Sequence, residues 1–94
     1  MTAPNRMKAA NLALYHFDSC PYCERVRGAV RRLDLEIELR DVHAEPKWRQ
    51  ELIAATGKPM VPCLRIEQPG GAARWLHEST DIIRYLETEV APRG

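Results

Sequence analysis

Residues 12–33 read LALYHFDSCPYCERVRGAVRRL and contain two hydrophobic patterns in succession. Leu12–Phe17 is a short apolar and aromatic run, which is typical of a buried strand. From Pro21 onward the apolar residues recur at helical spacing, at Cys23, Val26, Val30 and Leu33. The stretch therefore predicts a strand followed directly by a helix, with a pair of cysteines at the junction.

The rest of the chain continues the alternation of strands and helices. The expected elements are a strand at 35–42, a helix from Pro46 to Thr56-Gly57, strands at 61–66 and 74–77, and a final helix capped by Ser79 or Thr80. This order, β-α-β-α-β-β-α, predicts an α/β domain with a mixed four-stranded sheet and three helices on both faces.

Composition narrows the class of protein. The 94 residues allow one domain, which we place at 11–94, after a flexible tail at 1–10. Fourteen basic and thirteen acidic residues leave a net charge of +1, which gives no support for binding to nucleic acid. No apolar run is long enough for a membrane helix, and the first ten residues lack the apolar stretch of a secretory signal. Three cysteines, an odd number, favour a reduced cytoplasmic protein over a disulfide-linked secreted one.

The cysteine pair is the strongest functional signal. Cys20-Pro21-Tyr22-Cys23 places two thiols one helical turn apart, and Pro21 suits the first position of a helix. The N-terminus of a helix stabilises negative charge, so Cys20 is expected to attack as a thiolate. Cys23 lies on the apolar face and is expected to act second, as the resolving thiol.

Two simpler interpretations compete with redox chemistry. Zinc would need four ligands, and the remaining candidates, Cys63 and three histidines, form no paired motif. The cysteines could also be inert core residues. We expect no bound metal, because a CxxC pair beside a β-α-β pattern favours a redox motif.

These residues resemble the glutaredoxins, the glutathione-dependent branch of the thioredoxin fold. The resemblance extends from Leu12 to about Val90 and rests on Cys-Pro-Tyr-Cys at 20–23, on Val61-Pro62, and on Ser79-Thr80-Asp81. It implies a thioredoxin-like fold and an enzyme that uses glutathione as reducing co-substrate, with no tightly bound cofactor.

The resemblance also implies a set of glutathione contacts. Val61-Pro62 is similar to the family's cis-proline loop, whose backbone would pair with the cysteinyl unit. Ser79 and Thr80 would receive the γ-glutamyl carboxylate at a helix N-terminus, although ordinary helix capping would have the same sequence. Lys58 is similar to a residue that binds the glycyl carboxylate, or is a solvated lysine. Tyr22 would lie at the rim, and Pro21, Tyr22 and Pro62 would support the active site.

Two positions differ from the glutaredoxin pattern. Glu78-Ser79 replaces the Gly-Gly that many glutaredoxins have before the last helix, and it resembles glutathione transferases, where both residues bind the γ-glutamyl group. Phe17 stands where the family often has a lysine.

The sequence therefore predicts a monomeric oxidoreductase whose partners are glutathione and disulfide-containing or glutathionylated proteins. One alternative is a glutathione-binding module like the N-terminal domain of a glutathione transferase. Another is an iron–sulfur carrier in which Cys20 and glutathione hold a cluster.

Overall fold

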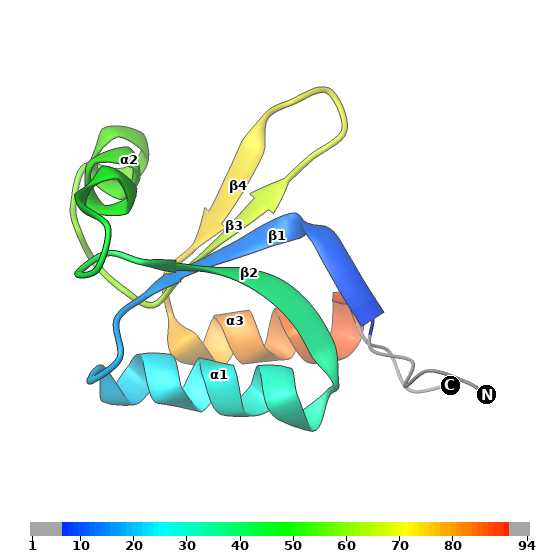
Figure 1. Ribbon diagram of the computed structural model, residues 1–94. Helices are drawn as coiled ribbons and strands as arrows, with labels where there is room; N and C mark the ends of the chain where they lie inside the picture. The colour runs from blue at the N-terminus through cyan, green and yellow to red at the C-terminus, as the bar shows by residue number, and fades with distance from the viewer. Residues whose placement is uncertain (1–6, 91–94) are drawn as a thin grey trace.

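The structure is a computed structural model that describes residues 7–90. A four-stranded sheet has the order β2-β1-β3-β4, with β1 (Met7–His16), β2 (Leu35–Asp41), β3 (Cys63–Glu67) and β4 (Ala73–Leu76). β2 is parallel to β1, whereas β3 and β4 are antiparallel to their neighbours. The helices α1 (Pro21–Arg32) and α3 (Ser79–Tyr85) cover one face, and α2 (Pro46–Thr56) lies on the other (Figure 1). The predicted element order and the thioredoxin-like α/β fold are confirmed.

The core lies mainly between the sheet and the helices α1 and α3. Leu14 and Leu64 of the central strands have no solvent exposure, and they pack with Val26 of α1 and Ile82 of α3. These are the apolar positions of the alternating strands and of the helical stripes, so burial follows the sequence pattern.

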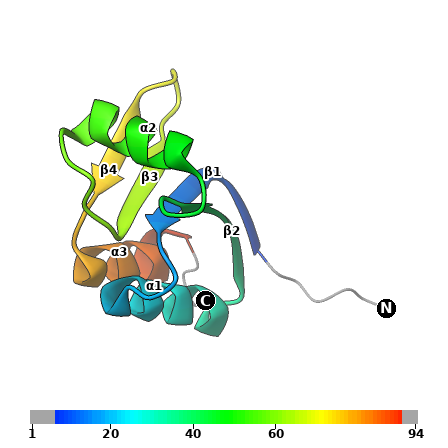
Figure 2. The ribbon, with the colours of Figure 1, turned by 60° about the vertical axis from the view of Figure 1, so that its left-hand side comes forward.

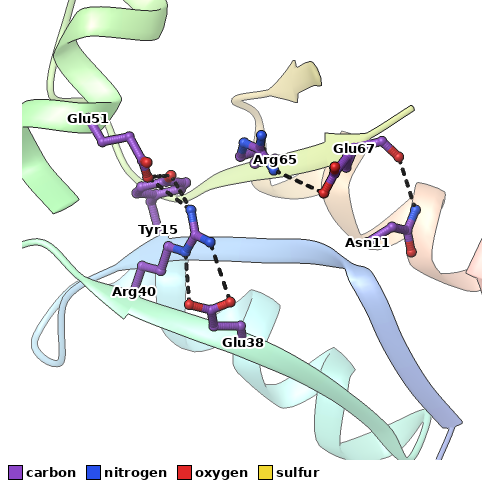
Figure 3. Close-up of polar contacts among 7 residues, drawn as sticks. All are labelled: Asn11, Tyr15, Glu38, Arg40, Glu51, Arg65 and Glu67. Carbon is purple, nitrogen blue, oxygen red and sulfur yellow. Dashed lines mark hydrogen bonds and ion pairs between the residues drawn. The ribbon is translucent and has the colours of Figure 1, made fainter. Parts of the chain in front are cut away.

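Helix α2 is attached to the opposite face by an apolar cluster, to which it contributes Leu52 and Trp48, and by one polar network. Leu52 is its one fully buried residue. The Tyr15 hydroxyl donates to the Glu51 carboxylate and accepts from Arg40 Nη1 at 2.7 Å, and Arg40 also pairs with Glu38 at 3.0 Å (Figure 3). Burial, and then the bond to Glu51, raise the pKa of Tyr15 to about 12, so the hydroxyl stays a donor. Gly57, with φ of 87°, ends the helix as predicted, because only glycine adopts this left-handed backbone without strain.

The first strand begins earlier than predicted. β1 starts at Met7, inside the segment that was expected to be a tail at 1–10, and Met7 pairs with Leu35 of β2. Backbone pairing does not depend on a run of large apolar side chains, which residues 7–10 lack, so the sequence pattern did not reveal it. The remainder of the expected tail, residues 1–6, lies outside the described residues, as do residues 91–94 of the expected domain.

The bounds of β3 and β4 also differ from those expected. β3 begins at Cys63, not at residue 61, because Pro62 has no N–H to donate to a ladder. β4 spans 73–76, one residue earlier than expected, since Ala73 pairs with Glu67.

The N-cap of the last helix also differs from that expected. The Glu78 carbonyl already accepts from Ile82 N–H at 2.9 Å, so Glu78 is the N-cap and Ser79 is the first helical residue. After Tyr85 the helix continues as a π-helical turn, η1 (Leu86–Val90).

Candidate functional site

The three sequence motifs meet at one end of the sheet, where β1 and β4 end and β3 begins. Tyr15 of β1 pairs with Cys63 of β3, and Leu64 pairs with Leu76 of β4, both antiparallel. The end of β1, the start of β3 and the end of β4 therefore lie together. The cysteine pair, Val61-Pro62 and Ser79-Thr80 follow or precede those strand ends directly, and both α1 and α3 begin there (Figure 2).

Cys20 is the N-cap residue of α1. Its backbone is extended, with φ of −78° and ψ of 117°, and Pro21 opens the helix as predicted. The Cys20 sulfur accepts a hydrogen bond from the Cys23 N–H at 3.2 Å. An N–H aimed at a sulfur, together with the helix dipole, stabilises negative charge on it.

Cys23 lies one turn further into the helix and has no solvent exposure, as its place on the apolar face predicts. Burial, and then the side-chain hydrogen bond to Cys20, raise the pKa of the Cys23 thiol to about 12. The two cysteines therefore differ in position: Cys20 lies at the helix N-cap, is 5% exposed and accepts an N–H, whereas Cys23 is fully buried.

The side chains around the pair have distinct surroundings. Tyr22 is 59% exposed, and the Arg25 guanidinium lies 5.9 Å from its ring centroid. The Val61–Pro62 bond is cis, as predicted, with Pro62 buried and Val61 half-buried. Lys58 is exposed, and its carbonyl accepts from the Thr56 hydroxyl at 2.9 Å, which ties the start of this loop to the end of α2.

At the start of α3, Ser79 is only 8% exposed, whereas Glu78 and Thr80 are exposed. The Glu78 side chain makes no capping hydrogen bond. The Glu78 backbone therefore caps the helix. Ser79 and Thr80 do not have the simple capping role that the sequence also allowed.

Arg27 is a site residue that the sequence analysis did not single out. Its guanidinium donates to the carbonyls of Phe17 at 3.2 Å and Asp18 at 3.0 Å, and lies 2.9 Å from His16 Nδ1. Arginine has only donors, so His16 Nδ1 accepts and the ring is neutral. Burial, followed by the Arg27 charge, lowers the pKa of His16 accordingly. Arg27 thus fixes the loop that carries Cys20. The sequence signal for it was its position four residues after Cys23, which places both residues on the same face of the helix.

We expect Arg27→Met to destabilise the protein by about 1–3 kcal/mol, because the part-buried Phe17 carbonyl and the Nδ1 of buried His16 lose their donor. Arg31→Met is the matched control, since Arg31 is exposed and makes an exposed ion pair with Glu24; its cost should stay below about 1 kcal/mol. Urea unfolding of the two variants measures the difference. Equal midpoints for Arg27→Met and wild type would show that the contacts do not hold the loop.

Cys63 and the two tryptophans have structural positions. Cys63 has no exposure, and burial raises its pKa to about 12. It belongs to a cluster with Tyr15, Trp48 and Trp75. Within residues 7–90, no group of three or more histidine, cysteine or acidic residues could hold a metal ion. None of the described helices is long and apolar enough to cross a membrane.

Residues 14–94 match the family described as glutathione S-transferase, N-terminal domain. The chain belongs to this family. The glutaredoxin resemblance is thereby confirmed at the level of the shared fold, and the matching family is that of the transferases. No curated protein sequence matches the chain.

Solved structures of glutathione transferases and of a maleylacetoacetate isomerase are similar to this chain. A trimeric glutathione transferase from Leishmania has 27% identity and a TM-score of 0.64, over 80% of this chain and 17% of its own. A maleylacetoacetate isomerase from Anaeromyxobacter dehalogenans, with bound dicarboxyethyl glutathione and citrate, has 27% identity and a TM-score of 0.62, over 89% of this chain and 41% of its own. The chain thus spans less than half the length of these proteins.

A glutaredoxin from Archaeoglobus fulgidus shares the fold at 16% identity and a TM-score of 0.59. In that comparison 73% of this chain covers 75% of the glutaredoxin. The fold is therefore common to both groups of relatives, and the difference between them must be argued from the site.

Proposed function

We propose that this chain is a glutathione-dependent thiol–disulfide oxidoreductase that reduces glutathione mixed disulfides and protein disulfides. The asymmetry of the cysteine pair carries the proposal. Cys20 stands at a helix N-cap and accepts a hydrogen bond, while Cys23 is fully buried with a pKa raised to about 12. Conjugation of glutathione to an electrophile has no need of a second cysteine at this spacing.

The first half of the reaction uses Cys20 alone. The Cys20 thiolate attacks one sulfur of the substrate disulfide, the S–S bond breaks, and the other sulfur leaves as a thiolate that takes a proton from water. For a glutathionylated substrate, Cys20 becomes bonded to glutathione. A second glutathione thiolate then attacks this mixed disulfide, which yields oxidised glutathione and returns the Cys20 thiolate.

A protein disulfide requires Cys23 as well. Cys23 attacks the Cys20 sulfur, releases the reduced protein and forms the Cys20–Cys23 disulfide, which two glutathiones reduce in turn. Part of what raises the Cys23 pKa is its hydrogen bond and charge interaction with Cys20. Both end when Cys20 enters a disulfide, so Cys23 becomes easier to ionise at the step where it must attack.

Glutathione would lie along the end of the sheet where the three motifs meet. Its cysteinyl unit would pair with the Val61 backbone beside Pro62, with Tyr22 at the rim. Its γ-glutamyl group would contact Glu78, Ser79 and Thr80 at the start of α3. Its glycyl carboxylate would pair with Lys58. Such a protein would act in the cytoplasm, where thiols are kept reduced.

A second candidate is a glutathione-binding module of the transferase type. The family match and the Glu78-Ser79 pair at the start of α3 favour it. Both candidates bind glutathione, and they differ in chemistry.

Two assays on the purified chain separate the candidates. The first couples reduction of a small glutathione mixed disulfide to NADPH consumption through glutathione reductase. The second follows conjugation of glutathione to an aryl halide by absorbance. We expect reduction without conjugation. Conjugation without reduction would replace the proposal with the transferase candidate. Absence of both activities would overturn the proposal, and the second candidate would then stand only if the chain binds glutathione.

Glutathione binding tests the contact at α3 in either case. We expect Ser79→Ala to weaken binding about fivefold in titration calorimetry, since one hydrogen bond contributes about 1 kcal/mol. Thr88→Ala is the control, because its hydroxyl bonds to the Arg84 carbonyl at the far end of the helix. Equal affinities for wild type and Ser79→Ala would place the γ-glutamyl group elsewhere.

A further inference from the structure

Strand β2 forms an unusually open edge of the sheet. It is an outer strand with β1 as its neighbour, and it has seven residues against four for β4 at the opposite edge. Figures 1 and 2 show no other described element beyond it. Proteins commonly protect such edges with proline, charged side chains or a bulge. The sequence LEIELRD of β2 contains no proline, and its four charged residues are of both signs, so whether they repel or attract a second strand depends on the register.

The register identifies the backbone groups that face outward. Val42 N–H donates to the His16 carbonyl of β1 at 2.9 Å. Backbone groups alternate in direction along a strand, so the N–H and C=O groups of Arg40 and Glu38 also point toward β1. The N–H and C=O groups of Ile37, Leu39 and Asp41 therefore point away from the sheet, toward a position where another strand could pair.

The two faces of this edge carry different side chains. Leu39 lies on the α1 side and is 47% exposed, one of the few exposed large apolar residues. It borders a groove of about 410 Å³ between α1 and β2, which Val30, Ile37 and Arg31 also line. On the opposite side, Arg40 is held in place by Glu38, by Tyr15 and by the Trp48 ring 4.5 Å away.

In place of the monomer expected from the sequence, we propose that a second copy of this chain pairs with β2 in antiparallel orientation, with the two-fold axis at Leu39. In this register Leu39 lies opposite Leu39 of the second copy, and Ile37 lies opposite Asp41. These are the residues with outward backbone groups, so each pair can exchange two hydrogen bonds. The exposed Leu39 side chains then cover one another.

Charge selects this register over its neighbours. With the axis at Leu39, Glu38 lies opposite Arg40 of the second copy, and the symmetry makes this two ion pairs. An axis at Glu38 would place two Glu38 carboxylates opposite one another, and an axis at Ile37 would place Glu36 opposite Glu38. Like charges directly opposite destabilise a strand pair, and unlike charges stabilise it.

Such a dimer leaves both cysteine sites accessible. The site lies beyond the carboxyl end of β1, and β2 runs parallel to β1. Antiparallel pairing of two β2 strands therefore places the two sites at opposite ends of a continuous sheet. The pairing is independent of the function of the site.

Sedimentation of the 94-residue chain tests the dimer. We expect a dimer at about 100 μM that weakens at least tenfold in Leu39→Lys, which places two cations opposite one another. Met60→Lys is the control, since Met60 is also 47% exposed and lies outside β2. Circular dichroism checks that both variants fold. A monomeric wild type at that concentration, or a dimer unaffected by Leu39→Lys, would overturn the proposal.

Disulfide trapping tests the register. With Cys20 and Cys23 replaced by serine, Leu39→Cys should form a disulfide-linked dimer, because paired Cα atoms at about 5.5 Å suit a disulfide. Glu38→Cys should not, since its opposite residue is Arg40. Trapping of Glu38→Cys in preference to Leu39→Cys would show that the register is wrong.

Discussion

Cys20→Ser should reduce glutathione-coupled reduction of both substrate classes to the rate measured without protein. A serine hydroxyl does not ionise near neutral pH, so no nucleophile remains at the N-cap. Cys23 cannot replace it, because it is fully buried and its pKa is raised to about 12. The variant should remain folded, since serine is nearly the same size and is a good N-cap residue.

Cys23→Ser should separate the two substrates. Glutathione itself can resolve the intermediate with a glutathionylated substrate, so most of that activity should remain. Reduction of a protein disulfide should fall about tenfold or more, because a tethered thiol acts at an effective concentration of millimolar or above. The measurement is kcat/KM on each substrate with the same protein preparation. Loss of both activities at unchanged stability would mean that Cys23 is structural or that the roles are exchanged.

The positions of these two cysteines could be predicted from sequence because the signals are local. A helix that begins at Pro21 with apolar residues every three or four positions must place Cys20 at its cap and Cys23 on its buried face. The same local logic placed Pro46 and Gly57 at the two ends of α2, as the structure has them.

Features that depend on tertiary partners could not be predicted in this way. A charged residue such as Arg27 on a helix is expected to be solvated. Only its hydrogen bonds to the loop carbonyls of Phe17 and Asp18 make it a site residue. The Tyr15, Arg40 and Glu51 network joins three elements distant in sequence, so no spacing reveals it. The N-cap of α3 is Glu78 and not Ser79 or Thr80, because the helix begins earlier with a backbone hydrogen bond that any residue can make.

Alkylation of the native protein should label Cys20 and leave Cys23 and Cys63 almost unreacted at pH 7. The thiolate is the reacting species, and a pKa of about 12 in place of 9.0 lowers the thiolate fraction about 1000-fold for each buried cysteine. Zero exposure of both side chains slows the reagent further. Mass spectrometry of the labelled peptides, followed over time, gives a rate for each residue.

The pH dependence of this labelling distinguishes charge from access. Between pH 7 and 10 the slow rates at Cys23 and Cys63 should still rise about tenfold per pH unit, because both thiols remain below a pKa of about 12. In concentrated urea all three cysteines should react at one rate, since burial, the first cause of the raised pKa values, is then lost. Cys63 is the internal control, because it is equally buried but has no partner cysteine among the causes of its pKa. Labelling of Cys23 as fast as Cys20 in the native protein would contradict the assignment of Cys20 as the attacking thiol.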